Sequence, residues 1–183
     1  MDNGASSYRR FLDGDKSAFD ELIETYREPL IAFINGFLHN PDESEDVAED
    51  AFMELIIHPK RYSFRSSFKT YLFTVARNKA IDRIRKEMRY SRSPIEELDM
   101  DDGIYTEDVI FRKENEAIVN RAIEKINPEY AVVLRLIYFE DMTGEEAGKV
   151  LGKSKRQMAN LTYRAKLSLK KSLEEEGFKY EKQ

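Results

Sequence analysis

Apolar residues recur at helical spacing along almost the whole chain, and this periodicity limits the possible folds more than any other feature. Residues 17–38, 42–57 and 68–90 carry apolar side chains at intervals of three and four, as amphipathic helices do. The same pattern returns at 109–126 and 128–140. Alternation with a period of two is almost absent, so the sequence predicts an all-α protein.

Prolines and polar residues indicate where these helices begin, bend and end. Pro29 is expected to kink or divide the first helix, and Asn40-Pro41 and His58-Pro59 should end the first two helices. Asn127-Pro128 should start the nearly all-apolar segment 128–140, which is expected to be the buried centre of a second domain. Residues expected on the inner faces of helices 42–57 and 68–90 include Val47, Ala51, Phe52, Leu55, Ile56, Phe68, Leu72, Val75, Ala76, Ile84 and Met88.

The composition excludes several classes of protein. The 183 residues include no Cys, which excludes disulfides, thiolate nucleophiles and Cys-ligated zinc. No stretch approaches the roughly 18–20 apolar residues that cross a bilayer, and the polar first ten residues lack the apolar segment of a secretory signal. A cytoplasmic protein of one or two domains is therefore expected.

The net charge of −5 conceals strong segregation along the chain. Residues 41–54 carry seven acids and no base, and residues 93–110 likewise carry seven acids and no base. Residues 60–92 carry eleven bases and two acids, and residues 153–171 carry seven bases and no acid. Solvated helix faces would explain one such block, but alternating blocks also suit a protein that meets partners of opposite charge.

The acidic segment 93–110 also holds Pro94 and Gly103 and has only scattered apolar residues, which suits an exposed linker. We therefore predict two small helical domains, 1–92 and 111–183, joined by a flexible acidic linker at 93–110.

Two capping boxes follow each other in the second domain. Thr143 with Glu146 and Ser154 with Gln157 each mark a helix start, and Gly152 supplies the turn between them. A short helix, a glycine turn and a second helix form a helix-turn-helix, the core of winged-helix-like DNA-binding domains. The residues expected to contact DNA are Lys153, Lys155, Arg156, Gln157, Asn160, Arg164 and Lys166. A helical hairpin with a basic, solvated face is the alternative.

Three blocks of sequence carry a family resemblance. They read GDKSAF at 14–19 followed by Leu22 and Tyr26, EDVAEDAF at 45–52, and FKTYLFTVARNKAIDRIR at 68–85. In this order, and followed by an acidic linker and a helix-turn-helix, they resemble the extracytoplasmic-function (ECF) type of bacterial sigma factor. The resemblance implies a two-domain protein that joins core RNA polymerase, reads and melts the −10 promoter element with its first domain and reads the −35 element with its second.

Residue types agree with these roles. For core polymerase binding we expect Asp46, Glu49, Asp50 and Met53, which face away from the apolar side of helix 42–57. The basic segment 60–92 supplies attraction for phosphates, and its aromatic residues suit bases removed from the stack. The expected −10 contacts are Tyr62, Phe64, Lys69, Tyr71, Arg77, Asn78 and Arg85, whereas Phe68 and Phe73 are expected in the core. Asp82 either contacts DNA or holds Arg85 or Arg89 by helical pairing.

Two other functions compete with this interpretation. A helix-turn-helix regulator that acts without polymerase would leave the acidic helix and the aromatic-basic segment unexplained. A metal or hydrolytic enzyme is suggested only by Glu54 and His58 at i, i+4, which is a poor site without further ligands. We expect no catalysis, no cofactor and no metal.

The resemblance also implies an anti-sigma factor as a partner, often membrane-bound, which could hold the protein at the membrane. Because acids dominate outside the two basic helices, the free protein should bind duplex DNA weakly and the holoenzyme should bind it well.

Overall fold

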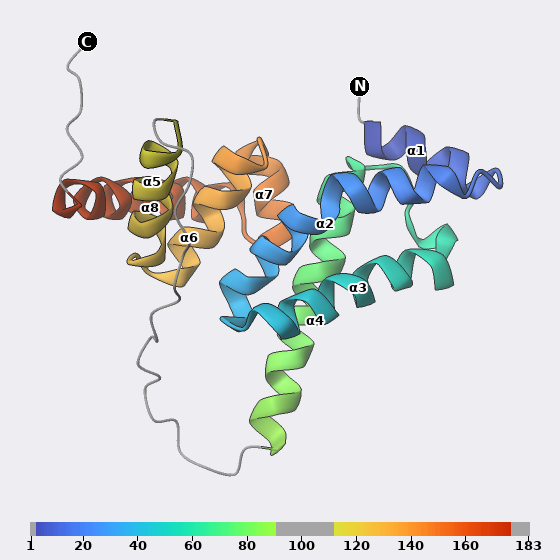
Figure 1. Ribbon diagram of the computed structural model, residues 1–183, viewed down its shortest axis with the longest axis horizontal. Coiled ribbons are helices and arrows are strands. Elements are labelled where there is room, and N and C mark those ends of the chain that lie inside the picture. The colour runs from blue at the N-terminus through green and yellow to red at the C-terminus, as the bar shows by residue number, and fades with distance from the viewer. Residues whose placement is uncertain (1–2, 91–111, 177–183) are drawn as a thin grey trace.

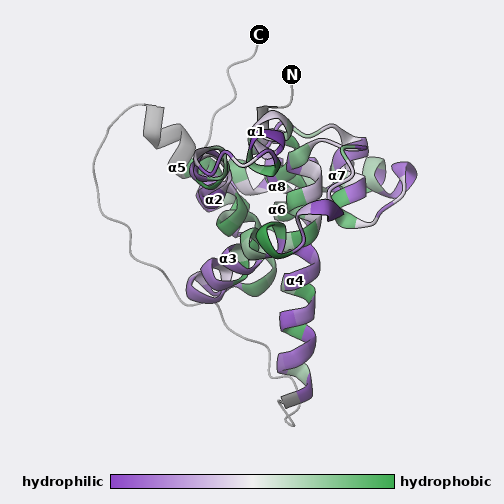
Figure 2. Ribbon diagram, turned by 90° about the vertical axis from the view of Figure 1, so that its right-hand side faces the viewer, coloured by the Kyte–Doolittle hydropathy of each residue, from purple (hydrophilic) through white to green (hydrophobic). Residues whose placement is uncertain are grey.

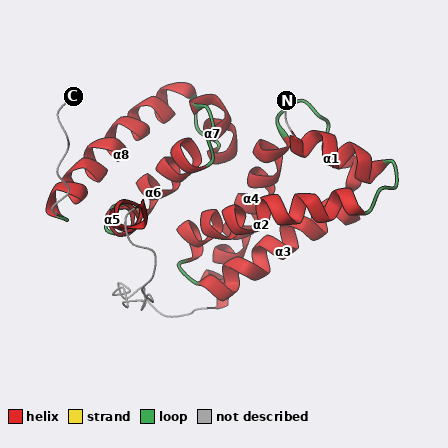
Figure 3. Ribbon diagram, turned by 45° about the horizontal axis from the view of Figure 1, so that its top comes forward, coloured by secondary structure: helices red, strands yellow, loops and turns green. Residues whose placement is uncertain are grey.

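The computed structural model describes residues 3–90 and 112–176, and all its regular elements in these ranges are helices (Figures 1 and 3). This confirms the prediction of an all-α protein. In chain order the elements are α1 (Asn3–Leu12), α2 (Ser17–Leu38), α3 (Pro41–Ile57), the 3-10 turn η1 (Pro59–Arg61), α4 (Phe68–Tyr90), α5 (Arg112–Glu124), α6 (Pro128–Leu134), the π-helical turn η2 (Arg135–Phe139), α7 (Gly144–Leu151) and α8 (Lys155–Glu175). The linker expected at 93–110 lies outside the described residues.

Helices α1 to α4 form one bundle around a core of aromatic and aliphatic side chains. Phe68 and Phe73 are fully buried in it, as expected. Helix α2 runs through Pro29 as a single helix, so of the two outcomes expected there, a kink or a division, the division does not occur. Proline removes one backbone hydrogen bond, and the fully buried Leu30, Phe33 and Ile34 just beyond it hold the second part of α2 against the core.

Helix α4 leaves the bundle halfway along its length. Ala80 is its last fully buried residue, and the segment beyond it projects from the body with a largely hydrophilic surface (Figures 1 and 2). Met88 on this segment is 64% exposed, so its expected place on an inner face was wrong. Arg83 on this segment pairs with Glu43 at the start of α3, and the helix continues beyond that contact to Tyr90.

Helix α1 was not anticipated from the sequence, because polar residues surround its few apolar ones. Its Tyr8 is fully buried and its hydroxyl is positioned to donate to the carbonyl oxygens of Leu55, at 3.1 Å, and Pro59, at 3.0 Å. Burial raises the pKa of Tyr8 to about 12. Tyr8 therefore ties α1 to the end of α3.

Replacing Tyr8 with Phe should lower the free energy of unfolding by about 1–2 kcal/mol, because the carbonyl groups of Leu55 and Pro59 lose the hydroxyl donor that they share. Urea denaturation measures this loss. Tyr163→Phe is the control, since Tyr163 is 64% exposed and its change should stay below about 0.5 kcal/mol. A Tyr8→Phe loss no larger than that of the control would contradict this structural role.

Helix α6, in the second half of the chain, begins with the cap that the sequence predicted. The Asn127 side chain accepts from the backbone N–H of Glu129, and Pro128 occupies the first turn of α6. The expected helix 128–140 is α6 continued by η2. Val132, Val133, Leu134 and Leu136 are buried, but Tyr138 and Phe139 are 51% and 45% exposed, so only part of this segment is a buried centre.

Helices α7 and α8 form the predicted helix-turn-helix. Both capping boxes are present, at Thr143 with Glu146 and at Ser154 with Gln157. Gly152 adopts φ +64° in the turn, a left-handed conformation that favours glycine. Within the two described ranges, no helix combines the length and apolar character needed to cross a bilayer.

Candidate nucleic-acid interface and docking surface

Six of the seven acids of α3 divide into two groups, and the seventh, Asp42, lies in its first turn. Glu43 pairs with Arg83 of α4 (Oε2–Nε 3.4 Å), Glu45 pairs with Arg27 of α2, and Glu54 pairs with Lys79 (Oε2–Nζ 3.5 Å) and with Arg61. Asp46, Glu49 and Asp50 are exposed and have no ion-pair partner among the described residues. The first group joins α3 to its neighbours, and the second group leaves carboxylates free for a partner.

Apolar side chains extend the second group toward the C-terminal end of α3. Met53, Ile56 and Ile57 are 49%, 45% and 60% exposed. Ile56 was expected on the inner face, and that prediction was wrong. We define the docking surface as Asp46, Glu49, Asp50, Met53, Ile56 and Ile57. The i+7 spacing counted from Glu49 and from Asp50 would have found Ile56 and Ile57. An exposed face that joins carboxylates to apolar side chains is typical of a protein interaction site.

The loop between α3 and α4 is closely packed rather than open. The Tyr62 ring is 4% exposed, and its hydroxyl donates to the Ser66 carbonyl at 2.8 Å. Tyr71 stacks on Tyr62 with ring centroids 4.9 Å apart, and burial raises the pKa of Tyr71. Tyr62 thus supports Tyr71 from the core, and its expected contact with a DNA base is not available in this arrangement.

Phe64 is the aromatic residue of this loop with an unusual backbone. Its φ is +59°, a left-handed conformation that is uncommon for a bulky residue. Its half-buried ring lies 4.4 Å from the Tyr62 ring centroid, and the Arg9 guanidinium lies 4.8 Å from its own centroid. Strained backbone is found at ligand-binding positions, which keeps Phe64 among the candidates for base contact.

The other residues expected to contact the −10 element differ in how exposed they are to solvent. Asn78 and Arg85 are exposed on the outer face of α4, and Arg85 pairs with Asp82 (Nη1–Oδ1 3.3 Å), one of the two roles considered for that aspartate. Lys69 and Arg77 are half-buried beside the second half of the chain. The structure thus presents part of this set to solvent and covers the rest.

The expected −35 residues lie along α8 and at its start. Lys155, Arg156, Asn160 and Arg164 are exposed. Gln157 is exposed too, but its Oε1 accepts from the Ser154 backbone N–H at 2.8 Å, so this side chain is already part of the cap. Lys153 pairs with Glu129 (Nζ–Oε1 2.7 Å), and the Lys166 ammonium lies 5.5 Å from the ring centroid of Tyr138.

The structure gives the metal-site alternative little support. His58 Nε2 lies 3.9 Å from Glu54 Oε1, but that carboxylate is already paired with Arg61 and Lys79. No group of three His, Cys, Asp or Glu side chains suitable for a metal ion occurs in the described part of the chain.

Comparison with known protein families finds a match for each half of the chain. Residues 22–90 match the model of sigma-70 region 2, and residues 116–169 match a model of sigma-70 region 4. The ECF RNA polymerase sigma factor SigW of Bacillus subtilis is 26% identical over 175 residues, covering 87% of this chain and 91% of the relative. The RNA polymerase sigma-H factor of Pseudomonas aeruginosa is 26% identical over 173 residues, covering 88% and 89%.

Solved structures share the fold. CnrH, in complex with the cytosolic domain of CnrY, aligns with a TM-score of 0.61 at 21% identity and covers 94% of this chain and 95% of its own. The sigma factor RpoE of Bartonella quintana, in complex with the anti-sigma factor NepR, aligns with a TM-score of 0.64 at 20% identity, covering 85% and 96%.

Two matched sigma-70 regions, in this order on one chain, define a sigma-70-type transcription initiation factor. This chain belongs to the ECF family of RNA polymerase sigma factors.

Proposed function

We propose that the chain is an alternative sigma factor that binds core RNA polymerase and directs promoter-specific initiation. The docking surface, with Asp46, Glu49, Asp50 and Met53 at its centre, would contact a basic helical surface of the polymerase. One observation carries this proposal: the docking surface on α3 is exposed, while Glu43, Glu45 and Glu54 of the same helix bind the basic side chains of its neighbours. A solvated acidic helix would not need exposed Met53, Ile56 and Ile57 beside its carboxylates.

In this proposal each half of the chain recognises one promoter element. The −10 strand would be contacted by Phe64, Lys69, Tyr71, Arg77, Asn78 and Arg85, with Tyr62 as support for Tyr71. The −35 element would be contacted by Arg156, Asn160 and Arg164 in the groove and by Lys153, Lys155 and Lys166 at phosphates. Gln157 contributes by fixing the start of the recognition helix and by any base contact that its amide nitrogen still allows.

Polymerase performs the chemistry in this proposal, so the chain itself needs no catalytic group, and it acts in the cytoplasm. An anti-sigma factor is a further proposed partner, supported by the solved complexes of CnrH with CnrY and of RpoE with NepR. The two domains would divide at the segment 93–110, with region 2 before it and region 4 after it.

Gel filtration with purified core polymerase separates this proposal from the regulator that acts alone. A sigma factor co-elutes with core at micromolar concentration, and the complex then binds promoter DNA that the free chain binds weakly. A chain that elutes apart from core but binds duplex DNA tightly would support the regulator instead.

A further inference from the structure

Helix α1 brings an arginine to the aromatic loop between α3 and α4. Tyr8 of α1 packs against Tyr62, with ring centroids 5.6 Å apart, and against Phe68, at 5.3 Å. This packing places the next residue, Arg9, beside the loop, and the guanidinium carbon of Arg9 lies 4.8 Å from the ring centroid of Phe64. Helix α1 precedes the segment that matches sigma-70 region 2, so the match assigns no role to Arg9.

The Arg9 guanidinium is free to bind another group. Arg9 is exposed and has no ion-pair partner among the residues that the structure describes. Its neighbour Arg10 differs, since Asp15 (Oδ2–Nη2 2.5 Å) and Glu21 (Oε1–Nη1 2.9 Å) both bind the Arg10 guanidinium. These two acids therefore neutralise Arg10 and tie α1 to α2, while Arg9 rests on the Phe64 ring.

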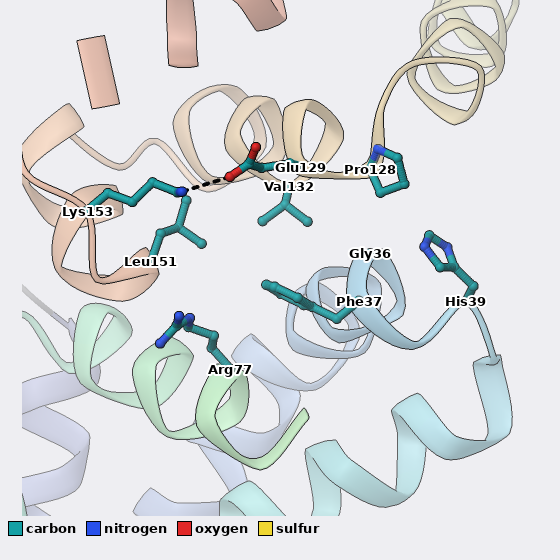
Figure 4. Close-up of a pocket in the computed structure, with 9 residues that line it drawn as sticks. All are labelled: Gly36, Phe37, His39, Arg77, Pro128, Glu129, Val132, Leu151 and Lys153. Atoms are coloured by element: carbon teal, nitrogen blue, oxygen red, sulfur yellow. Dashed lines mark ion pairs between the residues drawn. The ribbon is translucent and has the colours of Figure 1, made fainter. Parts of the chain in front are cut away.

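Two of the bases that we assign to the −10 element are less accessible than Arg9. Lys69 is bound by Glu140 (Nζ–Oε2 3.0 Å). Arg77 lines a pocket of about 400 Å³ that Lys153 of the second half also borders (Figure 4). A DNA strand that reaches the aromatic loop therefore meets, in Arg9, an exposed cation that needs no other partner to leave first.

Phe64 offers a surface on which an unstacked base can lie. Its half-buried ring lies 4.4 Å from the Tyr62 ring centroid, and its backbone has the left-handed φ of +59°. Proteins bind single strands by stacking bases on such rings and by placing cations along the strand's backbone. The loop at 62–67 supplies the exposed Arg65 and no acid, and α1 adds Arg9 over the ring itself.

Resting on the proposed function, we propose that Arg9 binds the phosphate of the −10 nucleotide whose base stacks on Phe64. In the free chain the Arg9 guanidinium lies over the ring. When a base stacks there, the guanidinium moves to the phosphate of the same nucleotide, which lies close by because a single sugar joins base and phosphate. The exchange favours binding, since a guanidinium–phosphate contact is charge-assisted and can be bidentate, whereas an exposed cation–π contact is weak. Helix α1 is thus part of the −10 site.

Binding of single-stranded DNA to the free full-length chain tests this role. Fluorescence anisotropy of a labelled oligo-dT strand of about 12 nucleotides gives the affinity at salt concentrations from about 50 to 200 mM. Each phosphate contact to a single strand contributes about 0.7 to the slope of log affinity against log salt concentration. Arg9→Gln should lower the affinity about fivefold at the lowest salt concentration and reduce the slope by about 0.7. If Arg9 only supported the Phe64 ring, the affinity would fall at an unchanged slope.

Three further variants locate the contact. Arg9→Lys should restore the slope and most of the affinity, because an ammonium also binds phosphate. Lys16→Gln is the control, since Lys16 is also exposed but lies at the start of α2, and its affinity should stay within about twofold of the parent. In a Phe64→Leu background, Arg9→Gln should cost less than about twofold, because the two residues act on one nucleotide.

The proposal is overturned if Arg9→Gln leaves the slope unchanged, if Arg9→Lys fails to restore it, or if the full loss persists in the Phe64→Leu background. It is overturned as well if the parent chain does not bind the strand. Thermal unfolding of Arg9→Gln should match that of the parent, because Arg9 is exposed. These measurements need no polymerase, so failure to bind core would refute the proposed function separately.

Discussion

Replacing Asp50 with Arg and Met53 with Ala together should weaken binding to core RNA polymerase about 100-fold. Asp50 supplies a free carboxylate and Met53 an exposed apolar side chain at the centre of the docking surface. Central interface residues of this kind commonly contribute about 2–4 kcal/mol when changed, and reversing a charge against a basic surface adds repulsion. Because neither side chain supports the fold, thermal unfolding should stay close to that of the parent.

The matched control carries the same kinds of change elsewhere. Leu12 is 41% exposed on α1 and Glu24 is exposed on α2, so Leu12→Ala with Glu24→Arg removes one exposed apolar group and reverses one charge. Affinity for core, measured by anisotropy of the labelled chain, should remain within about twofold of the parent for this control. The Asp50 effect should shrink as salt rises, since the charges lie near the surface. Equal affinities for the two double variants would contradict the assignment of the docking surface.

Replacing Arg156 with Ala should lower holoenzyme affinity for its preferred −35 element by about 5- to 100-fold and relax preference at one position. Arg156 lies in the first turn of α8, where recognition helices meet base edges, and it is exposed. Lys166 lies nearly three turns further along the helix, above Tyr138, where a phosphate contact is expected. Lys166→Ala should therefore weaken all sequences evenly.

Selection from a library randomised at the −35 element distinguishes these two variants. Gln157 needs a different substitution, because alanine would remove its capping hydrogen bond along with any base contact. Gln157→Glu keeps the capping box and changes only the groups offered to DNA. Uniform weakening across all sequences for Arg156→Ala as well as Lys166→Ala would refute direct readout by Arg156.

Local signals in the sequence predicted the helices and their caps well. Asn127, Thr143 and Ser154 cap helices as predicted, because capping depends on residues only two or three positions away. Helix α1 escaped prediction because its single fully buried large side chain, Tyr8, gives no repeating apolar pattern.

Long-range packing explains the errors in the candidate site. An aromatic residue in a polar loop is expected to be exposed. Tyr62 is nevertheless buried, because it packs against Tyr8 of α1 and against Phe68, the first residue of α4. The partner of Lys69 lies 71 positions away, and no local pattern connects them. The burial of Arg77 likewise follows from a turn in the other half of the chain.

Transcription from a genomic DNA pool tests the central claim most directly. Purified core polymerase is mixed with fragmented DNA of the organism that encodes this chain, with and without the chain, and the 5′ ends of the transcripts are mapped by sequencing. We expect a set of start sites that depends on the chain, with two shared sequence elements centred near −10 and −35, and we expect the Asp50→Arg/Met53→Ala variant to lose them. Transcripts that are the same with and without the chain would contradict its assignment as a sigma factor.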